Sequence, residues 1–108
     1  MLNSNRLDPE LLKSILQPLL DDFKYWFERS RSFLETEKIS FLATEEQSEL
    51  LARVKQAQQE VNTANILFQA TAGQVGIDMA ALTPWHKLLH ECRQVAIRFR
   101  SEQSDQQQ

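Results

Sequence analysis

Apolar residues recur at steps of three and four along most of this chain, and this spacing is typical of α-helices that bury one face. The first stretch shows the pattern most completely. Its stripe is formed by Leu12, Ile15, Leu16, Leu19, Leu20, Phe23, Trp26, Phe27, Ser30, Phe33 and Leu34. Asp8 can cap exposed backbone N–H groups, and Pro9 suits the first helical position because it lacks an N–H group. We therefore predict a helix from Asp8-Pro9 to about Leu34.

Pro18 interrupts this first helix. A proline removes one backbone hydrogen bond and crowds the preceding turn, so the helix should bend or break near residues 14–17. On a helical projection Pro18 lies opposite the apolar stripe, and a bend there would leave the buried face intact. We expect a kinked helix, with two shorter helices as the alternative.

Five aromatic residues cluster in the same helix, namely Phe23, Tyr25, Trp26, Phe27 and Phe33. Such a cluster can line a pigment or cofactor pocket. Four of the five lie on the apolar stripe, however, where burial in the core is the simpler interpretation. We therefore expect them to pack, and we expect no cofactor.

A second helix is predicted over residues 45–72. Residues 35–43 before it lose the pattern and should form a connecting loop. Thr44-Glu45-Glu46-Gln47 matches a capping box, in which Thr44 binds the first backbone N–H groups and Gln47 reaches back to the cap. Gly73 should end the helix, because a left-handed residue costs glycine little. The apolar seam reads Leu50, Val54, Ala57, Val61, Ala64, Phe68 and Thr71.

Thr83-Pro84 repeats the combination of cap and proline and predicts a third helix from there to about Arg100. A short helical turn is expected at residues 78–82. Residues 101–108 carry no apolar anchor and should be a disordered polar tail. The apolar face of the third helix reads Trp85, Leu88, Leu89, Cys92, Val95, Ala96 and Phe99.

These elements predict an all-α fold, a three-helix antiparallel bundle that forms one domain over residues 8–100. A length of 108 residues suits one domain, and 42% hydrophobic with 25% charged residues is near the globular average. No apolar stretch approaches the roughly 20 residues of a membrane-spanning helix. The N-terminus has no signal-peptide core. We expect a cytoplasmic protein that does not bind a membrane.

Composition also bears on the class of function. Cys92 is the only cysteine, which excludes an internal disulfide and a zinc site of several thiolates. The formal charge of −3 disfavours nucleic acid as a partner, although a local basic patch can still exist. Gly73 and Gly76 are the only glycines, and no phosphate-binding loop can be built from them. We expect no enzymatic activity.

His86 and His90 lie one helical turn apart, a spacing at which two imidazoles can share a metal ion. Zinc needs one or two further ligands, and Arg93 would oppose a cation. Surface histidines are therefore the favoured interpretation, and a metal- or small-ligand-binding protein is the alternative function. His90, Glu91 and Cys92 combine a base, an acid and a nucleophile, but consecutive helical residues project about 100° apart and cannot converge.

Surplus apolar surface points to a protein partner. Ile66 and Leu67 project away from the seam of the second helix, which is then apolar almost all round. The segment at residues 75–82 or another subunit can cover them, and both possibilities stay open. Three helices also leave the place of a fourth, which self-association would fill, so we predict a homodimer or a complex with another protein. The candidate interface consists of Ile66, Leu67, Ile77, Met79 and Ile97.

Three stretches are similar to a family of short cyanobacterial proteins classed as a domain of unknown function. They are PLLDDFKYWFERSR at residues 18–31, LLARVKQAQQEV at residues 50–61 and PWHKLL at residues 84–89. The resemblance covers about residues 8–100 and implies a helical fold and a cyanobacterial cytoplasm. It brings no catalytic residue and no ligand. The leading hypothesis is therefore a non-enzymatic interaction or scaffold domain.

Overall fold

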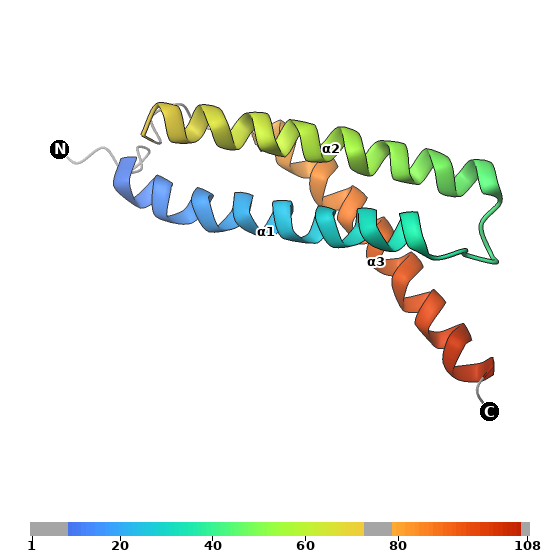
Figure 1. Ribbon diagram of the computed structural model, residues 1–108. Coiled ribbons are helices and arrows are strands. Elements are labelled where there is room, and N and C mark those ends of the chain that lie inside the picture. The colour runs from blue at the N-terminus through green and yellow to red at the C-terminus, as the bar shows by residue number, and fades with distance from the viewer. Residues whose placement is uncertain (1–8, 73–78, 107–108) are drawn as a thin grey trace.

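The computed structural model describes residues 9–72 and 79–106, and its regular elements are three α-helices (Figure 1). Helix α1 spans Pro9–Thr36, α2 spans Thr44–Ala70 and α3 spans Met79–Gln106. No strand occurs in the described part of the chain. The all-α, three-helix fold class is therefore confirmed.

Helices α1 and α2 lie side by side and antiparallel (Figure 1). Gln17 Nε2 of α1 donates to Asn65 Oδ1 of α2 at 3.3 Å, and Arg31 Nη1 further along α1 donates to Gln58 Oε1 at 3.2 Å. The partner numbers fall in α2 as they rise in α1, as an antiparallel pair requires. Helix α3 crosses this pair obliquely, and its C-terminal end extends beyond it (Figure 1). The antiparallel geometry predicted for the bundle thus applies most directly to α1 and α2.

The core is shared by all three helices and contains most of the predicted stripes. Trp85 of α3 is buried in it, and its Nε1 donates to Glu60 Oε1 at 2.9 Å, which satisfies the one polar group of the indole. Ile15 and Trp26 are exceptions to the prediction, because both are exposed on a flank of α1. The buried apolar residues are Leu16, Leu20, Phe23, Phe27, Leu34, Ile39, Leu50, Val54, Ala57, Val61, Phe68, Leu82, Trp85, Leu88 and Cys92.

Helix α1 continues through Pro18 and ends at Thr36, so the alternative of two shorter helices is wrong. Pro18 and Ser14 are both exposed, and water can therefore reach the backbone where the proline interrupts the hydrogen bonds. The Ser14 hydroxyl donates to the Leu11 carbonyl at 2.7 Å in the same turn. The bend at Pro18 stays a prediction.

The start of α2 differs from the predicted capping box by one residue. Ala43, not Thr44, is the N-cap, and its backbone N–H donates to Glu46 Oε1 at 2.8 Å. Gln47 has a different role, because its Nε2 donates to the carbonyls of Leu34 at 3.0 Å and Glu37 at 2.8 Å. The side chain of Gln47 therefore ties the connecting loop to the end of α1 instead of capping α2.

The end of α2 also lies earlier than predicted, at Ala70. The left-handed residue that follows is Ala72, with φ of 54°. Its N–H donates to the Gln69 carbonyl at 3.1 Å, which satisfies one of the last carbonyls of the helix. Gly73, the predicted stop, lies outside the described residues.

Helix α3 is longer at both ends than the sequence pattern predicted. It begins at Met79, so Pro84 lies inside it and Thr83 is not its cap. Leu82 is buried, and this contact with the core holds the turn before the proline. The helix continues to Gln106, and the prediction of disorder is wrong for residues 101–106, while residues 107–108 lie outside the described part. Arg98 Nε pairs with Glu102 Oε2 at 2.9 Å, an i,i+4 contact that supports this last stretch.

No described helix combines the length and the apolarity that crossing a lipid bilayer requires. This agrees with the absence of long apolar stretches from the sequence.

Candidate functional site: a groove between α1 and α3

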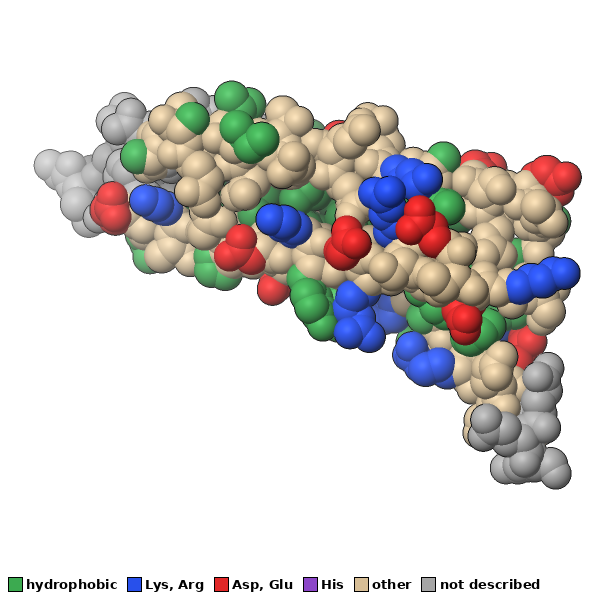
Figure 2. All heavy atoms as spheres, in the orientation of Figure 1, with side chains coloured by type: hydrophobic (Ala, Val, Ile, Leu, Met, Phe, Trp, Pro, Cys, Tyr) green, Lys and Arg blue, Asp and Glu red, His purple; other side chains and the backbone are tan. Residues whose placement is uncertain are grey.

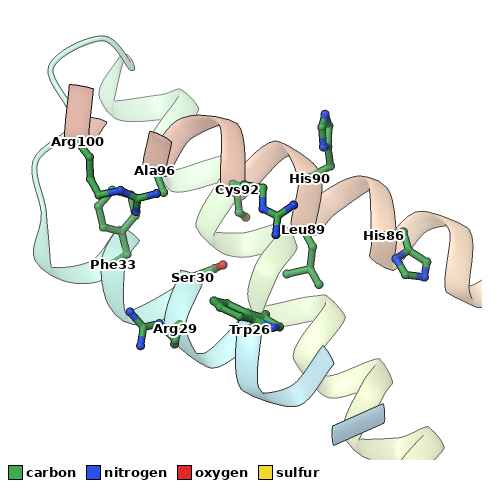
Figure 3. A pocket seen from close by; sticks show the side chains of 11 residues that line it. Trp26, Arg29, Ser30, Phe33, His86, Leu89, His90, Cys92, Ala96 and Arg100 are labelled. Carbon is green, nitrogen blue, oxygen red and sulfur yellow. The ribbon is translucent and has the colours of Figure 1, made fainter. Parts of the chain in front are cut away.

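The oblique course of α3 leaves a groove of about 610 Å³ between it and α1. His86 lies toward one end and Arg100 toward the other, while the side chains of Trp26 and Leu89 point into the space between the helices (Figure 3). The groove is lined by Trp26, Arg29, Ser30 and Phe33 of α1 and by His86, Leu89, His90, Cys92, Arg93, Ala96 and Arg100 of α3.

The groove has an apolar floor and a rim of larger exposed side chains. Phe33, Leu89 and Ala96 are half-buried in the floor. The Phe33 ring meets the Phe99 ring edge-on at 5.1 Å, and this contact holds the floor in place. The exposed members are Trp26, Arg29, His86, His90, Arg93 and Arg100. A ligand in this groove would meet apolar surface below and cations at the sides.

Trp26 and its neighbours form an ordered part of the rim. The Trp26 ring meets the Tyr25 ring edge-on at 4.9 Å, and the Arg29 guanidinium lies 5.9 Å from the centre of the Trp26 ring. Arg29 Nη1 also donates to Tyr25 Oη at 3.1 Å. Trp26 is 49% exposed, so the prediction that it packs in the core is wrong. Its contacts hold it in place at the groove instead.

The groove is electropositive although the chain carries a formal charge of −3. None of the described residues that line it is acidic. Elsewhere in the described chain, Arg31, Arg53 and Arg98 each pair with a glutamate. The other arginines of the described ranges are Arg29, Arg93 and Arg100, and these three line the groove without a salt bridge to a described residue. Their charges are therefore not compensated locally.

Cys92 lies at the bottom of the groove and is buried, as the sequence predicted. Burial raises the pKa of the Cys92 thiol, and this outweighs a hydrogen bond with Ser30 that acts in the opposite direction. The thiol therefore stays protonated at neutral pH. A buried protonated thiol is a poor nucleophile, so Cys92 acts here as an apolar contact.

The two histidines contact different neighbours. The His86 ring packs edge-on against Phe23 at 4.9 Å, whereas His90 Nε2 lies 3.4 Å from Gln94 Nε2. Figure 3 shows His90 pointing away from the space between the helices. Within residues 9–72 and 79–106, no group of three His, Cys, Asp or Glu side chains could hold a metal ion. Metal binding at His86 and His90 stays a prediction, and the described residues supply no third ligand.

The residues His90, Glu91 and Cys92 do not converge. Glu91 lies against α2, where Arg53 donates hydrogen bonds to both of its carboxylate oxygens, while Cys92 is buried. The 100° steps of a helix separate the three side chains as expected.

The described members of the predicted interface lie on two helices, with Ile66 and Leu67 on α2 and Ile97 on α3. Ile66 and Leu67 are 58% and 52% exposed near the end of α2, where Figure 2 shows hydrophobic side chains on the surface. Ile97 is 47% exposed on α3, one turn from Arg93. Ile77 lies outside the described residues, and the side chain of Met79 is not described. Among the described members of the candidate interface, Ile97 is the one that lies a single turn from a groove residue.

Sequence reasoning missed the groove, although one signal was available. Arg29, Arg93 and Arg100 have no acidic residue three or four positions away in either direction. Arg31 has two, at Glu28 and Glu35, while Arg53 and Arg98 have one each, at Glu49 and Glu102. Arginines without an acidic neighbour on their own helix face are available to bind something else.

No curated protein and no solved structure matches the chain. The resemblance to a family of unknown function is confirmed, whereas a cyanobacterial origin and a cytoplasmic location stay predictions. The matching family model carries the description "protein of unknown function (DUF2605)". It matches residues 6–101, nearly the whole chain, and the protein therefore belongs to this family.

Proposed function

We propose that this chain is a protein-interaction domain that binds its partner in the groove between α1 and α3. The observation that carries the proposal is that exposed Trp26 and three arginines, which have no acidic partner among the described residues, surround an apolar floor. Tryptophan, tyrosine and arginine contribute most of the binding energy in protein interfaces. Charged residues of one sign around an apolar centre also give specificity and fast association.

The lining supports binding more than catalysis. Its described residues include no carboxylate, and its thiol is buried with a raised pKa. His86 and His90 are the remaining candidates for proton transfer, and neither has a carboxylate partner in the described part of the chain. A non-enzymatic role is therefore part of the proposal.

The proposed homodimer rests on another surface. Ile66 and Leu67 are adjacent and more than half exposed, and such side chains favour association when they face a second apolar surface. Light scattering over a range of concentrations tests this part. A chain that stays monomeric throughout would contradict the homodimer and leave the groove proposal intact.

Site-specific photo-crosslinking in cells tests the groove. We replace Trp26 with a photo-reactive phenylalanine and compare it with the same residue at Gln59, which is exposed on α2 and does not line the groove. We expect a discrete cross-linked protein from position 26 and none from position 59. Identical products from both positions, or no product from position 26, would refute the proposed function.

A further inference from the structure

The groove favours one kind of occupant over others. We infer that it binds an acidic amphipathic α-helix of a partner protein, which lies along α1 and α3 as a fourth helix. This inference rests on the proposed function and adds the chemistry of the bound segment.

The dimensions of the groove suit a helix of moderate length. His86 and Arg100 lie 14 residues apart in α3, which corresponds to about 21 Å at 1.5 Å per residue. A partner helix of about four turns covers this distance. The volume of about 610 Å³ accommodates a row of side chains, so the partner would insert one face into the groove.

The floor selects apolar residues at helical spacing. Phe33, Leu89 and Ala96 are half-buried and become fully buried only when another surface covers them. A helix that places leucine or similar residues at i, i+3 or i+4, and i+7 does this along the whole groove. Trp26 stands beside this row and adds a large contact surface.

The rim selects carboxylates at defined positions. Arg93 and Arg100 are seven residues apart on α3, so they lie on the same flank at about 10 Å from each other. Glutamates seven residues apart on the partner helix match this spacing. Arg29 belongs to α1 on the other side of the groove and would bind an acidic residue on the opposite flank. Each arginine can bind a carboxylate through two N–H groups.

A nucleic acid fits the same surface less well. The chain has a formal charge of −3, which repels a long polyanion, and three arginines provide few phosphate contacts. The phosphate backbone would also leave the apolar floor without a partner. An acidic amphipathic helix satisfies the floor and the rim together.

Calorimetry with designed peptides tests the inference. The probe is an 18-residue helical peptide with leucines along one face and glutamates seven residues apart beside it. The control peptide has lysines in place of the glutamates. We expect the acidic peptide to bind the full chain, and the basic peptide to bind at least roughly tenfold more weakly.

Charge reversal on the protein provides the matched comparison. The double variant Arg93→Glu with Arg100→Glu should weaken binding of the acidic peptide at least roughly tenfold and strengthen binding of the basic one. Lys24→Glu with Lys87→Glu changes the net charge equally at exposed positions outside the groove and should bind the acidic peptide like the wild type. Circular dichroism checks that each variant keeps its helices.

Several outcomes would overturn the inference. Equal binding of both peptides to the wild-type chain would show that charge does not select the occupant. Equal loss of acidic-peptide binding in the two double variants would show that the peptide responds to the net charge of the protein and not to the groove. If crosslinking at Trp26 captures a protein while the acidic peptide fails to bind, the interaction function stands and the acidic helix is wrong.

Discussion

Arg53 of α2 binds Glu91 of α3 through two hydrogen bonds of 2.8 Å each, from Nη1 to Oε2 and from Nη2 to Oε1. The pair joins the two helices, and neither residue is among the described residues that line the groove. The hydrogen bonds from Arg53 lower the pKa of Glu91, and the same contact raises the pKa of Arg53. Side-chain exposures of 44% and 47% mean that solvent screens the pair, so its contribution is modest.

This pair makes stability dependent on pH. Because the folded pKa of Glu91 lies below its ordinary value of 4.5, its contribution is present above that value and is lost as the pH falls through the folded pKa. Glu91→Gln should therefore lower the free energy of unfolding by about 0.5–1 kcal/mol at neutral pH and by less near pH 3. Urea denaturation at both pH values measures the difference. Asp22→Asn is the exposed control, and a pH-independent loss in Glu91→Gln would contradict the explanation.

The side chain of Gln47 should contribute more to the stability of the fold than a solvent-exposed polar side chain does. Its Nε2 donates hydrogen bonds to the carbonyls of Leu34 and Glu37, and its Oε1 accepts a hydrogen bond from the Ile39 N–H at 3.3 Å. Gln47→Ala removes all three contacts at a half-buried site and should cost about 1–3 kcal/mol. Gln59→Ala on the exposed face of α2 serves as the control. Equal denaturation midpoints for the two variants would show that the loop does not depend on Gln47.

The turn after α2 can be stabilised by one substitution. Ala72 has φ of 54°, a conformation that costs a residue with a Cβ atom about 1 kcal/mol. Ala72→Gly should raise the free energy of unfolding by about 0.5–1 kcal/mol, because glycine adopts this conformation without that cost. Ala70→Gly, at the last residue of the helix, should lower it instead. A lower melting temperature for Ala72→Gly would argue against a left-handed residue at this position.

Replacing each of the two tryptophans by alanine should reduce the stability of the protein by very different amounts. Trp85 is buried and bonds Glu60, so Trp85→Ala should cost about 3–5 kcal/mol. Trp26 is half exposed at the groove, and Trp26→Ala should cost less than about 1 kcal/mol. Thermal and urea unfolding measure both. A large loss of stability from Trp26→Ala would mean that this residue belongs to the core and not to a binding surface.

Cys92 should react slowly with thiol reagents in the folded protein. It is buried, and burial raises the pKa of its thiol, so the reactive thiolate is scarce at neutral pH. We expect labelling by an aromatic disulfide reagent to be much slower than in urea and to accelerate as the pH rises. Rapid labelling of the native protein at neutral pH would contradict the described burial.

The middle part of each helix, as opposed to its ends, could be predicted from the sequence alone. The seam of Leu50, Val54, Ala57, Val61 and Phe68 is buried as its alternating spacing indicated, because helical geometry places such residues on one face whatever the partner is. The helix ends were less predictable. Thr83-Pro84 has the local chemistry of a start signal, but burial of Leu82 in the core extends α3 back to Met79.

The unpaired arginines could be found in the sequence, but the location of the groove could not be predicted because it depends on how α3 crosses the other two helices. Spacing along α1 places Trp26 on the apolar stripe next to Phe23 and Phe27, and no local rule says which edge of the stripe a third helix will cover. The crossing leaves Trp26 exposed and brings Arg29 to the same groove as Arg93 and Arg100. The sequence by itself determined three amphipathic helices and their buried faces, since these follow from periodicity. Only the tertiary structure decided which side chains remain uncovered, since that depends on contacts between residues distant in the chain.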